Sequence, residues 1–229
     1  MTKILALETA TEACSVALWL DGAVLERHEV APRGHAERVL PMMEAVLAEA
    51  GLGLRQLDGL AFGRGPGAFT GVRIAAGVAQ GAAFGADLPV VPVSTLAALA
   101  EGVRREGLAS RVLAAIDARK GEVYWGAYRG EPSGVVEPVG EECVTPPEAV
   151  PLPEGGHWYG AGTGWGTYHV ALNARLGDDR LAGWEDDRLP RARDVAALAA
   201  PVLAEGGGLA PEAAVPVYLR DRVAEVRTG

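Results

Sequence analysis

Short apolar runs alternate along the first half of the chain with stretches of helical period. The apolar runs predict strands at 4–7, 15–20, 23–30, 57–63 and 90–93. Asp21-Gly22 predicts a hairpin between the second and third, because both residues tolerate the positive φ of a tight turn. Apolar residues spaced about 3.6 apart predict helices near 39–50, 70–85 and 95–105, and Pro41 predicts that the first helix starts or kinks there. This order is typical of a mixed α/β domain.

The second half of the chain begins by repeating the first. Residues 113–118 echo residues 4–10, since each stretch is an apolar strand that ends in an acid, Glu8 or Asp117, before a turn and another strand. The echo predicts a duplicated α/β fold with two similar lobes of mixed sheets and flanking helices, at residues 1–106 and 107–229. Residues 130–156 hold six prolines and six glutamates, which predicts irregular acidic loops, and helical patterns return near 165–176 and 194–205.

The composition is globular and acidic. The 229 residues are 49% hydrophobic and 22% charged, and the formal net charge is −9. Because nucleic-acid binders normally present a basic face to phosphates, the isolated chain is expected to bind nucleic acid poorly. Cys14 and Cys143 lie far apart in the sequence and do not have the spacing of a disulfide framework, which favours a protein of a reducing compartment over a secreted one. Glu8 interrupts the apolar stretch that a signal peptide needs, and residues 71–86 are too short and polar for a membrane span, so a soluble cytoplasmic protein is expected.

A glycine-rich loop at residues 63–71 precedes the second predicted helix. Gly65 and Gly67 are candidates for an anion-binding loop, because closely spaced glycines leave backbone N–H groups free at a helix N-terminus. The loop lacks the Lys-Ser/Thr ending of a P-loop. A tight turn that lets the helix pack closely is the favoured interpretation.

Glu8 and Asp117 are candidates for a nucleotide–metal site across a cleft between the lobes. Arg119 and Lys120 follow Asp117, where a closely approaching phosphate would need smaller side chains, so acids that merely end strands are the favoured interpretation. The four histidines, including His35, lack the spacing of a metal site, and no catalytic motif is found. The residues alone thus predict a duplicated α/β protein with an incomplete nucleotide cleft.

The chain closely resembles the TsaB (YeaZ) family. The combination of GPGAFTG with DARKGEVYW is typical of that family. Glu8 is a departure, because the family usually has Asp there, and this argues further against a metal site. The matching stretches, which span nearly the whole chain, are ILALETATEACSVAL at 4–18, HAERVLP at 35–41, GRGPGAFTGVRIAAGVAQGAA at 63–83, VSTLAALA at 93–100, RVLAAIDARKGEVYWGAY at 111–128, GTGW at 162–165 and PVYLR at 216–220.

The resemblance implies the duplicated fold of the actin, Hsp70 and sugar-kinase (ASKHA) superfamily. It implies a non-catalytic subunit that supports TsaD, together with the ATPase TsaE, in transferring threonylcarbamoyl to adenosine 37 of tRNAs reading codons that begin with A. TsaD carries a paired-histidine metal site, whereas only His35 lies in the comparable region here. No metal or cofactor of its own is therefore expected. ATP is used by the complex, and tRNA is reached only through it.

The resemblance also places the contact with TsaD, and a homodimer that mimics it, on the first two predicted helices. Small residues at one per turn let another helix approach closely, and methionine adapts to different partners. The expected contact residues are Val39, Met42, Met43, Val46, Gly71, Ala75, Val78 and Ala82. Ala75→Arg or Ala82→Glu is therefore expected to block TsaD binding and to preserve the fold. The alternative is that both helices simply cover the sheet.

Two other functions stay open at this point. The first is an ATP-dependent enzyme, like the superfamily's kinases, and the incomplete phosphate loops weigh against it. The second is a metallopeptidase, and the missing ligand spacing weighs against that one.

Overall fold

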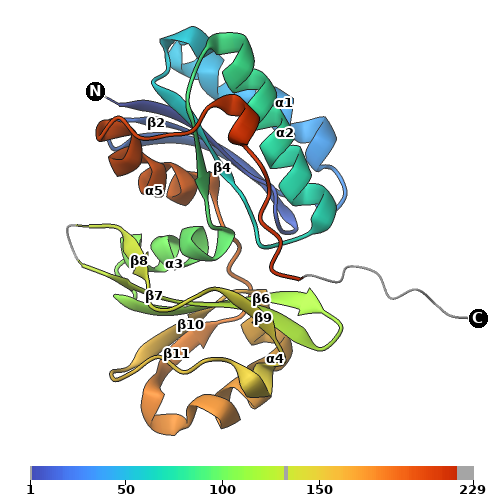
Figure 1. Ribbon diagram of the computed structural model, residues 1–229, viewed down its shortest axis with the longest axis vertical. Coiled ribbons are helices and arrows are strands. Elements are labelled where there is room, and N and C mark those ends of the chain that lie inside the picture. The colour runs from blue at the N-terminus through green and yellow to red at the C-terminus, as the bar shows by residue number, and fades with distance from the viewer. Residues whose placement is uncertain (1, 132–133, 221–229) are drawn as a thin grey trace, which may run out of the picture.

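The computed structural model describes residues 2–131 and 134–220, which form two lobes, each built on one sheet (Figure 1). The first sheet has the strand order β3-β2-β1-β4-β5, and the second has the order β11-β10-β6-β7-β8, with β9 paired to β7. The strands are β1 (Lys3–Glu8), β2 (Ala13–Leu20), β3 (Ala23–Val30), β4 (Gly59–Gly63), β5 (Val90–Val93), β6 (Arg111–Arg119), β7 (Glu122–Gly130), β8 (Val136–Pro138), β9 (Cys143–Thr145), β10 (Trp158–Ala161) and β11 (Leu181–Glu185).

The two sheets share one topology. β1 pairs antiparallel with β2 and parallel with β4, and β6 pairs antiparallel with β7 and parallel with β10. The outer strands β5 and β11 then run parallel to β4 and β10. Sheet order and strand direction therefore confirm the duplicated α/β fold that the echo between residues 4–10 and 113–118 predicts.

Helices cover both faces of each sheet. α1 and α2 pack on one face of the first sheet and α5 on the other, whereas α3 and α4 cover the two faces of the second sheet (Figure 1). The helices are α1 (His35–Ala50), α2 (Phe69–Ala86), α3 (Thr95–Arg105), α4 (Thr163–Leu176) and α5 (Ala192–Ala204), with short 3₁₀ turns η1 (Leu54–Gln56), η2 (Pro147–Ala149), η3 (Asp178–Arg180) and η4 (Pro211–Ala213).

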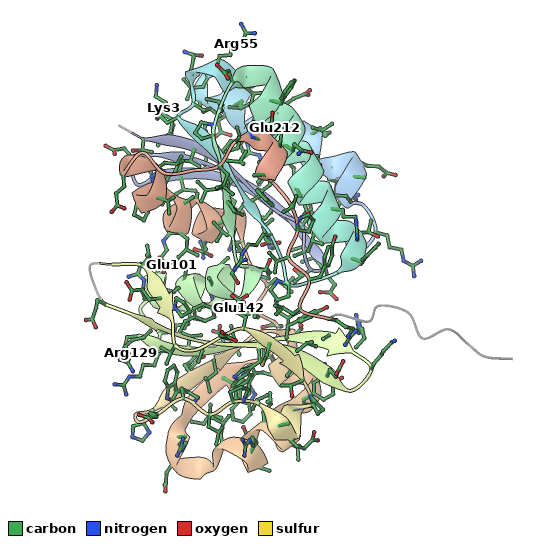
Figure 2. The ribbon with its side chains drawn as sticks, viewed as in Figure 1. Lys3, Arg55, Glu101, Arg129, Glu142 and Glu212 are labelled. Atoms are coloured by element: carbon green, nitrogen blue, oxygen red, sulfur yellow. The ribbon has the colours of Figure 1, made fainter. Side chains whose placement is uncertain are left out.

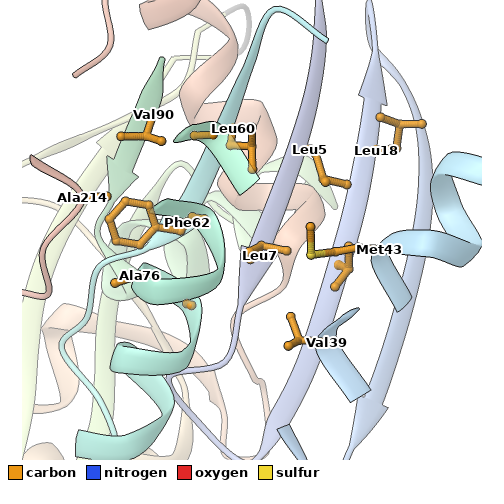
Figure 3. Packing of buried hydrophobic residues seen from close by; sticks show 14 of the residues in the cluster. Leu5, Leu7, Leu18, Val39, Met43, Leu60, Phe62, Ala76, Val90 and Ala214 are labelled. Atoms are coloured by element: carbon orange, nitrogen blue, oxygen red, sulfur yellow. The ribbon is translucent and has the colours of Figure 1, made fainter. Parts of the chain in front are cut away.

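Alternation along the strands builds this layered core. Leu5 and Leu7 of β1 face α1 and α2 (Figure 3), and Ile4 and Ala6, which alternate with them, pack with residues of α5. Successive side chains of a strand point to opposite faces, so an all-apolar strand needs a helix on each side. The sequence of β1 therefore requires the helix layers that the fold supplies.

Two helices, α3 and α5, each follow a strand of one sheet but pack on the other sheet, and we call them the crossing helices. α3 follows β5 in the chain but packs on the second sheet, and α5 follows β11 but packs on the first. The predicted boundary at residues 106 and 107 thus separates the two sheets but not the helices that cover them. Ion pairs join the end of α3 to the start of α5, since Arg105 lies 2.8 Å from Asp194, and Glu106, just after α3, pairs with Arg193.

Two acids, Glu101, which is buried, and Glu142, which is half-buried, also form contacts in the region where the lobes meet. Glu101 of α3 pairs with Arg104 and accepts a hydrogen bond of 3.1 Å from the backbone N–H of Val136. Glu142 accepts hydrogen bonds from the hydroxyls of Ser94 and Tyr128. Figure 2 shows both acids beside α3, between the two sheets.

Two local predictions differ from the structure. α1 begins at His35, so the alternative in which the helix starts at Pro41 is wrong, and the proline lies inside the helix. Asp117 lies within β6, two residues before its end, whereas Glu8 is the last residue of β1. Ser94 caps α3, because its hydroxyl accepts a 3.2 Å hydrogen bond from the N–H of Ala97. None of the helices in the described part of the chain is both long and apolar enough to cross a bilayer.

Candidate functional site

A cleft of about 770 Å³ lies between the lobes. The turn after β1, the start of α1 and the first turn of α2 line it from the first lobe. The end of β6 and the hairpin tip that follows line it from the second lobe, and residues 217–220 complete its wall. The duplicated fold therefore brings the two repeated strand ends to one cavity.

The glycine-rich loop packs directly against the turn after β1. A Cβ at Gly71 would lie 2.0 Å from the carbonyl oxygen of Thr9, and one at Gly67 would lie 2.3 Å from that of Ala10. The N–H of Ala68 donates to the Ala10 carbonyl at 2.7 Å. Gly67 and Gly71 are therefore explained by the close approach of the loop to the backbone of the turn after β1, as the tight-turn interpretation predicts.

Glu8 is fully buried behind the cleft and does not line it. Its carboxylate accepts hydrogen bonds from the N–H of Ala10 at 2.6 Å and from the hydroxyl of Thr95 at 3.2 Å. Gly63 makes room for it, because a Cβ there would lie 2.0 Å from Oε2 of Glu8. Burial raises the pKa of the Glu8 carboxyl to about 7, although the hydrogen bonds oppose that shift.

This buried carboxyl predicts that the chain loses stability as the pH rises. Because the pKa of Glu8 is higher in the folded state than in the unfolded chain, its contribution is complete at acidic pH and is lost as the pH rises through about 7. Glu8→Gln should abolish this loss, so at pH 8 the variant is expected to be more stable than the wild type by roughly 3 kcal/mol. Urea unfolding at pH 5 and pH 8 measures the difference. An equal pH dependence of the unfolding free energy in both proteins would contradict the raised pKa of Glu8. The variant still contains Asp194, whose pKa burial raises to about 6, so a smaller loss of stability with rising pH is expected to remain.

Asp117 lines the cleft but is engaged by its own hairpin. Its carboxylate accepts hydrogen bonds from the backbone N–H and the guanidinium of Arg119, at 2.8 and 2.9 Å, and from the Tyr168 hydroxyl at 3.3 Å. Glu8 and Asp117 therefore do not face each other across an open space, and the pair does not fit the water-held metal of a nucleotide site. Within the described residues, no three side chains of His, Cys, Asp or Glu gather as a possible metal site.

His35 is buried at the start of α1, with Nε2 3.2 Å from the carbonyl oxygen of Ala13. It lines the cleft. Because it is buried and Gly34 holds the N-cap position, it is neither an exposed histidine nor a helix cap, which are the usual roles of a histidine at such a position. Its contact with Ala13 links the start of α1 to the start of β2.

The predicted partner surface is wrong for five of its eight residues. Ala75, Gly71, Val39, Met43 and Val46 are buried in the chain's own core. Figure 3 shows Val39 and Met43 of α1 pointing towards β1 and β2. The line of small residues on α2 lets the helix lie close to its own sheet, which is the alternative that the sequence left open. Met42, Val78 and Ala82 are partly exposed at the border of this core.

The exposed side of α2 consists of other residues. Arg73, Gly77, Gly81 and Phe84 follow one another along it and are all exposed, and we call them the outer face of α2. A Cβ at Gly77 or Gly81 would meet no atom within 4 Å, and Phe84 is 70% exposed. The repeat of glycine at positions 77, 81 and 85 is visible in the sequence and is the signal that could have located this face.

α1 lies beside α2 on the same outer side of the first lobe (Figure 1). It adds the exposed apolar side chain of Leu40. The outer side of the two helices thus carries the exposed apolar side chains of Leu40 and Phe84.

Comparisons with known proteins agree with this architecture. A family model described as "TsaD: tRNA N6-adenosine threonylcarbamoyltransferase" matches residues 27–170. The tRNA threonylcarbamoyladenosine biosynthesis protein TsaB of Escherichia coli K12 is 47% identical over 97% of this chain and 96% of its own length. The TsaB protein of Haemophilus influenzae is 42% identical over 96% of this chain and 94% of its own.

Solved structures also match this chain over nearly its whole length. YeaZ from Pseudomonas aeruginosa is 50% identical, with a TM-score of 0.88 over 96% of this chain and the whole of that one. The similarity spans both sheets, the crossing helices and the glycine-rich loop. With its duplicated ASKHA-like fold, the chain therefore belongs to the TsaB family of tRNA threonylcarbamoyladenosine biosynthesis proteins.

Proposed function

We propose that this chain is a non-catalytic subunit that supports TsaD, together with TsaE, in transferring threonylcarbamoyl to adenosine 37 of tRNAs reading codons that begin with A. The observation that supports this role is that Glu8, buried behind the cleft, and Asp117, which lines it, both have partners within the chain. Glu8 is buried against Gly63 and Thr95, and Asp117 is paired with Arg119. Neither carboxylate is placed to hold a metal-bound nucleotide, so the ATP of the reaction would be used elsewhere in the complex.

The partner surface we propose is the outer face of α2 together with the adjoining exposed side of α1. TsaD would pack a helix there, and a second copy of this chain would occupy the same face when TsaD is absent. Bare glycines at positions 77 and 81 allow two helix axes to come within about 8 Å of each other. Phe84 and Leu40 supply apolar area that is exposed in the monomer.

Reconstitution of tRNA modification tests the proposal. When a threonylcarbamoyl donor and ATP are supplied, TsaD and TsaE should modify tRNA only slowly without this chain, and at least tenfold faster with it. Glu8→Gln and Asp117→Asn should each leave that acceleration within about twofold of the wild type. A tenfold loss in either variant, with folding and TsaD binding intact, would show that the cleft takes part in the chemistry.

The isolated chain is expected to bind tRNA negligibly at physiological salt. Its net charge of −9 opposes the neutralisation of phosphates that supplies most non-specific affinity. Two of its cleft arginines, Arg119 and Arg220, are also paired with acids of the chain. A gel-shift titration with the pure subunit measures this, and submicromolar binding would contradict the prediction.

A further inference from the structure

We propose that Arg73, which is stacked on the rings of Phe69 and Tyr218, binds a carboxylate of the protein that packs on the outer face of α2. We call these three residues the Arg73 clamp. The proposal rests on the proposed function, because that function supplies the partner on α2. It adds the C-terminal segment at residues 214–220 to the partner surface and names the chemistry that the partner must present there.

The first observation is the geometry of the clamp. Cζ of Arg73 lies 3.3 Å from the centroid of the Phe69 ring and 4.9 Å from that of the Tyr218 ring. The two ring centroids are 6.0 Å apart, and the ring planes are inclined by 36°. Nη1 of Arg73 donates a 3.1 Å hydrogen bond to the carbonyl oxygen of Phe69. The rings and this hydrogen bond therefore orient the guanidinium before a partner arrives.

The second observation is that the clamp is exposed and lacks an acid. Phe69 is 52% exposed and Tyr218 44%, and Arg73 is exposed as well. Arg64 and Arg104 of the same lobe pair with glutamates, whereas Arg73 forms no ion pair with any residue of the described ranges 2–131 and 134–220. Arginine and aromatic side chains of this kind are the ones most enriched at the centres of protein interfaces.

The third observation is how Tyr218 is held beside α2. The C-terminal segment runs alongside that helix (Figure 1). Before Tyr218, the N–H of Val217 donates a 2.8 Å hydrogen bond to the carbonyl oxygen of Arg64. After Tyr218, Arg220 forms an ion pair with Glu122 of the second lobe. Because the segment is fixed on both sides of Tyr218, its ring is part of the folded surface next to α2.

The position of the clamp explains why the partner must bring an anion. Arg73 belongs to the outer face of α2 and lies one helical turn before Gly77, where a Cβ would meet no atom within 4 Å. A helix that approaches closely over Gly77 therefore also covers Arg73 and the neighbouring rings. Burying a charge without a partner is costly, so this surface favours a protein with an acidic group at that point.

A carboxylate fits the clamp better than a nucleic-acid phosphate does. The edge of a guanidinium binds a planar carboxylate through two parallel hydrogen bonds, and stacking leaves that edge free. Affinity for a nucleic acid instead grows with the number of phosphates that are neutralised. Arg73 is the one basic residue of α2, and the whole chain has a net charge of −9. The clamp is therefore assigned to an Asp or Glu of the partner protein.

Calorimetric titration of TsaD into the full chain tests the role of Arg73. Arg73→Gln should weaken binding roughly thirtyfold, as for an arginine at the centre of an interface. Arg73→Lys should weaken it about tenfold, because lysine keeps the charge but loses the stacking and the paired hydrogen bonds. Added salt should weaken the wild type more than Arg73→Gln. Arg55→Gln is the matched control and should bind as the wild type does, because Arg55 is exposed at the far end of the first lobe (Figure 2).

Tyr218 acts through Arg73 as a positioning residue, and its variants test that. Tyr218→Leu should weaken TsaD binding about fivefold, whereas Tyr218→Phe should keep wild-type affinity, because the hydroxyl has no hydrogen-bond partner in the described part of the chain. In the Arg73→Gln background, Tyr218→Leu should have a smaller effect than it has alone. Equal losses in Tyr218→Phe and Tyr218→Leu, or fully additive losses with Arg73→Gln, would overturn the positioning role.

Gly81→Arg separates the clamp from the partner surface itself. If Gly81→Arg blocks TsaD binding and Arg73→Gln does not weaken it, the surface on α2 stands and the clamp is overturned. If neither variant weakens binding, both the surface and the clamp are wrong. Thermal melts confirm that each variant is folded. An equal loss in Arg55→Gln, or unchanged TsaD affinity in Arg73→Gln with weaker tRNA binding by the complex, would also overturn the assignment to a protein carboxylate.

Discussion

Ala75→Arg is expected to unfold the chain rather than to produce a folded subunit that fails to bind its partner. Ala75 is fully buried between α2 and the first sheet, among residues such as Phe62 and Ala79. An arginine there would overpack the core and bury an unpaired charge, which together cost roughly 5 kcal/mol or more. A loss of that size approaches the whole stability of a typical domain. Circular dichroism and the soluble fraction on expression measure the effect.

Gly77→Arg is the matched control for this variant. It places the same side chain on the same helix two residues later, where a Cβ meets no atom within 4 Å. Replacing an exposed helical glycine also removes its low helix propensity, so the melting temperature should stay the same or rise slightly. A cooperative melt of Ala75→Arg within a few degrees of the wild type would show that Ala75 is not packed against the sheet.

The contrast between these two positions shows where the sequence is informative about α2. The length of the helix and its start after the glycine loop follow from the pattern of apolar residues. Its orientation does not, because alanine and glycine occupy both sides of the helix and neither side is strongly polar. Which line of small residues faces the sheet is decided by contacts with distant segments, such as the approach of Gly71 to Thr9.

The pattern of apolar residues predicts the buried strands better than it predicts the orientation of α2, for a physical reason. A strand buried on both faces must be apolar throughout, so β1 and β6 are recognisable from sequence alone. The crossing of α3 and α5 is not recognisable, because an apolar helix stripe fits either sheet. The apolar pattern predicts that the strand ends at Asp117, whereas β6 continues through a register shift to Arg119.

The candidate site was predictable only in its parts. Glu8 and Asp117 were identified as acids of the repeated strands, and the cleft between the lobes follows from the duplication. The Glu8 carboxylate accepts a hydrogen bond from Thr95, which is far away in the chain and belongs to a helix that packs on the other sheet. Thr11, which lines the cleft and whose buried hydroxyl has no hydrogen-bond partner among the described atoms, has no sequence signal, because a threonine after a strand is ordinary.

Gly81→Arg is expected to abolish binding to TsaD while the subunit stays folded. Gly81 lies on the outer face of α2 with open space around it, so the monomer can accommodate the side chain. In the proposed complex, a helix of the partner packs against that position, and an arginine there would force the helices apart and leave a charge unpaired. Such a change costs roughly 4 kcal/mol, which corresponds to about a thousandfold weaker binding. Size-exclusion chromatography with TsaD and calorimetry measure the loss.

Gly81→Ala and Val170→Arg separate the effects of side-chain size, charge and location. Gly81→Ala should stabilise the monomer by about 1 kcal/mol, because alanine favours the helix, yet weaken TsaD binding by roughly tenfold as the helices are held apart. Val170→Arg places an arginine on an exposed site of α4, in the second lobe, and should leave binding unchanged. Only a surface that depends on close helix approach predicts opposite effects of Gly81→Ala on stability and binding. If Gly81→Arg still co-elutes with TsaD as the wild type does, the partner binds another face.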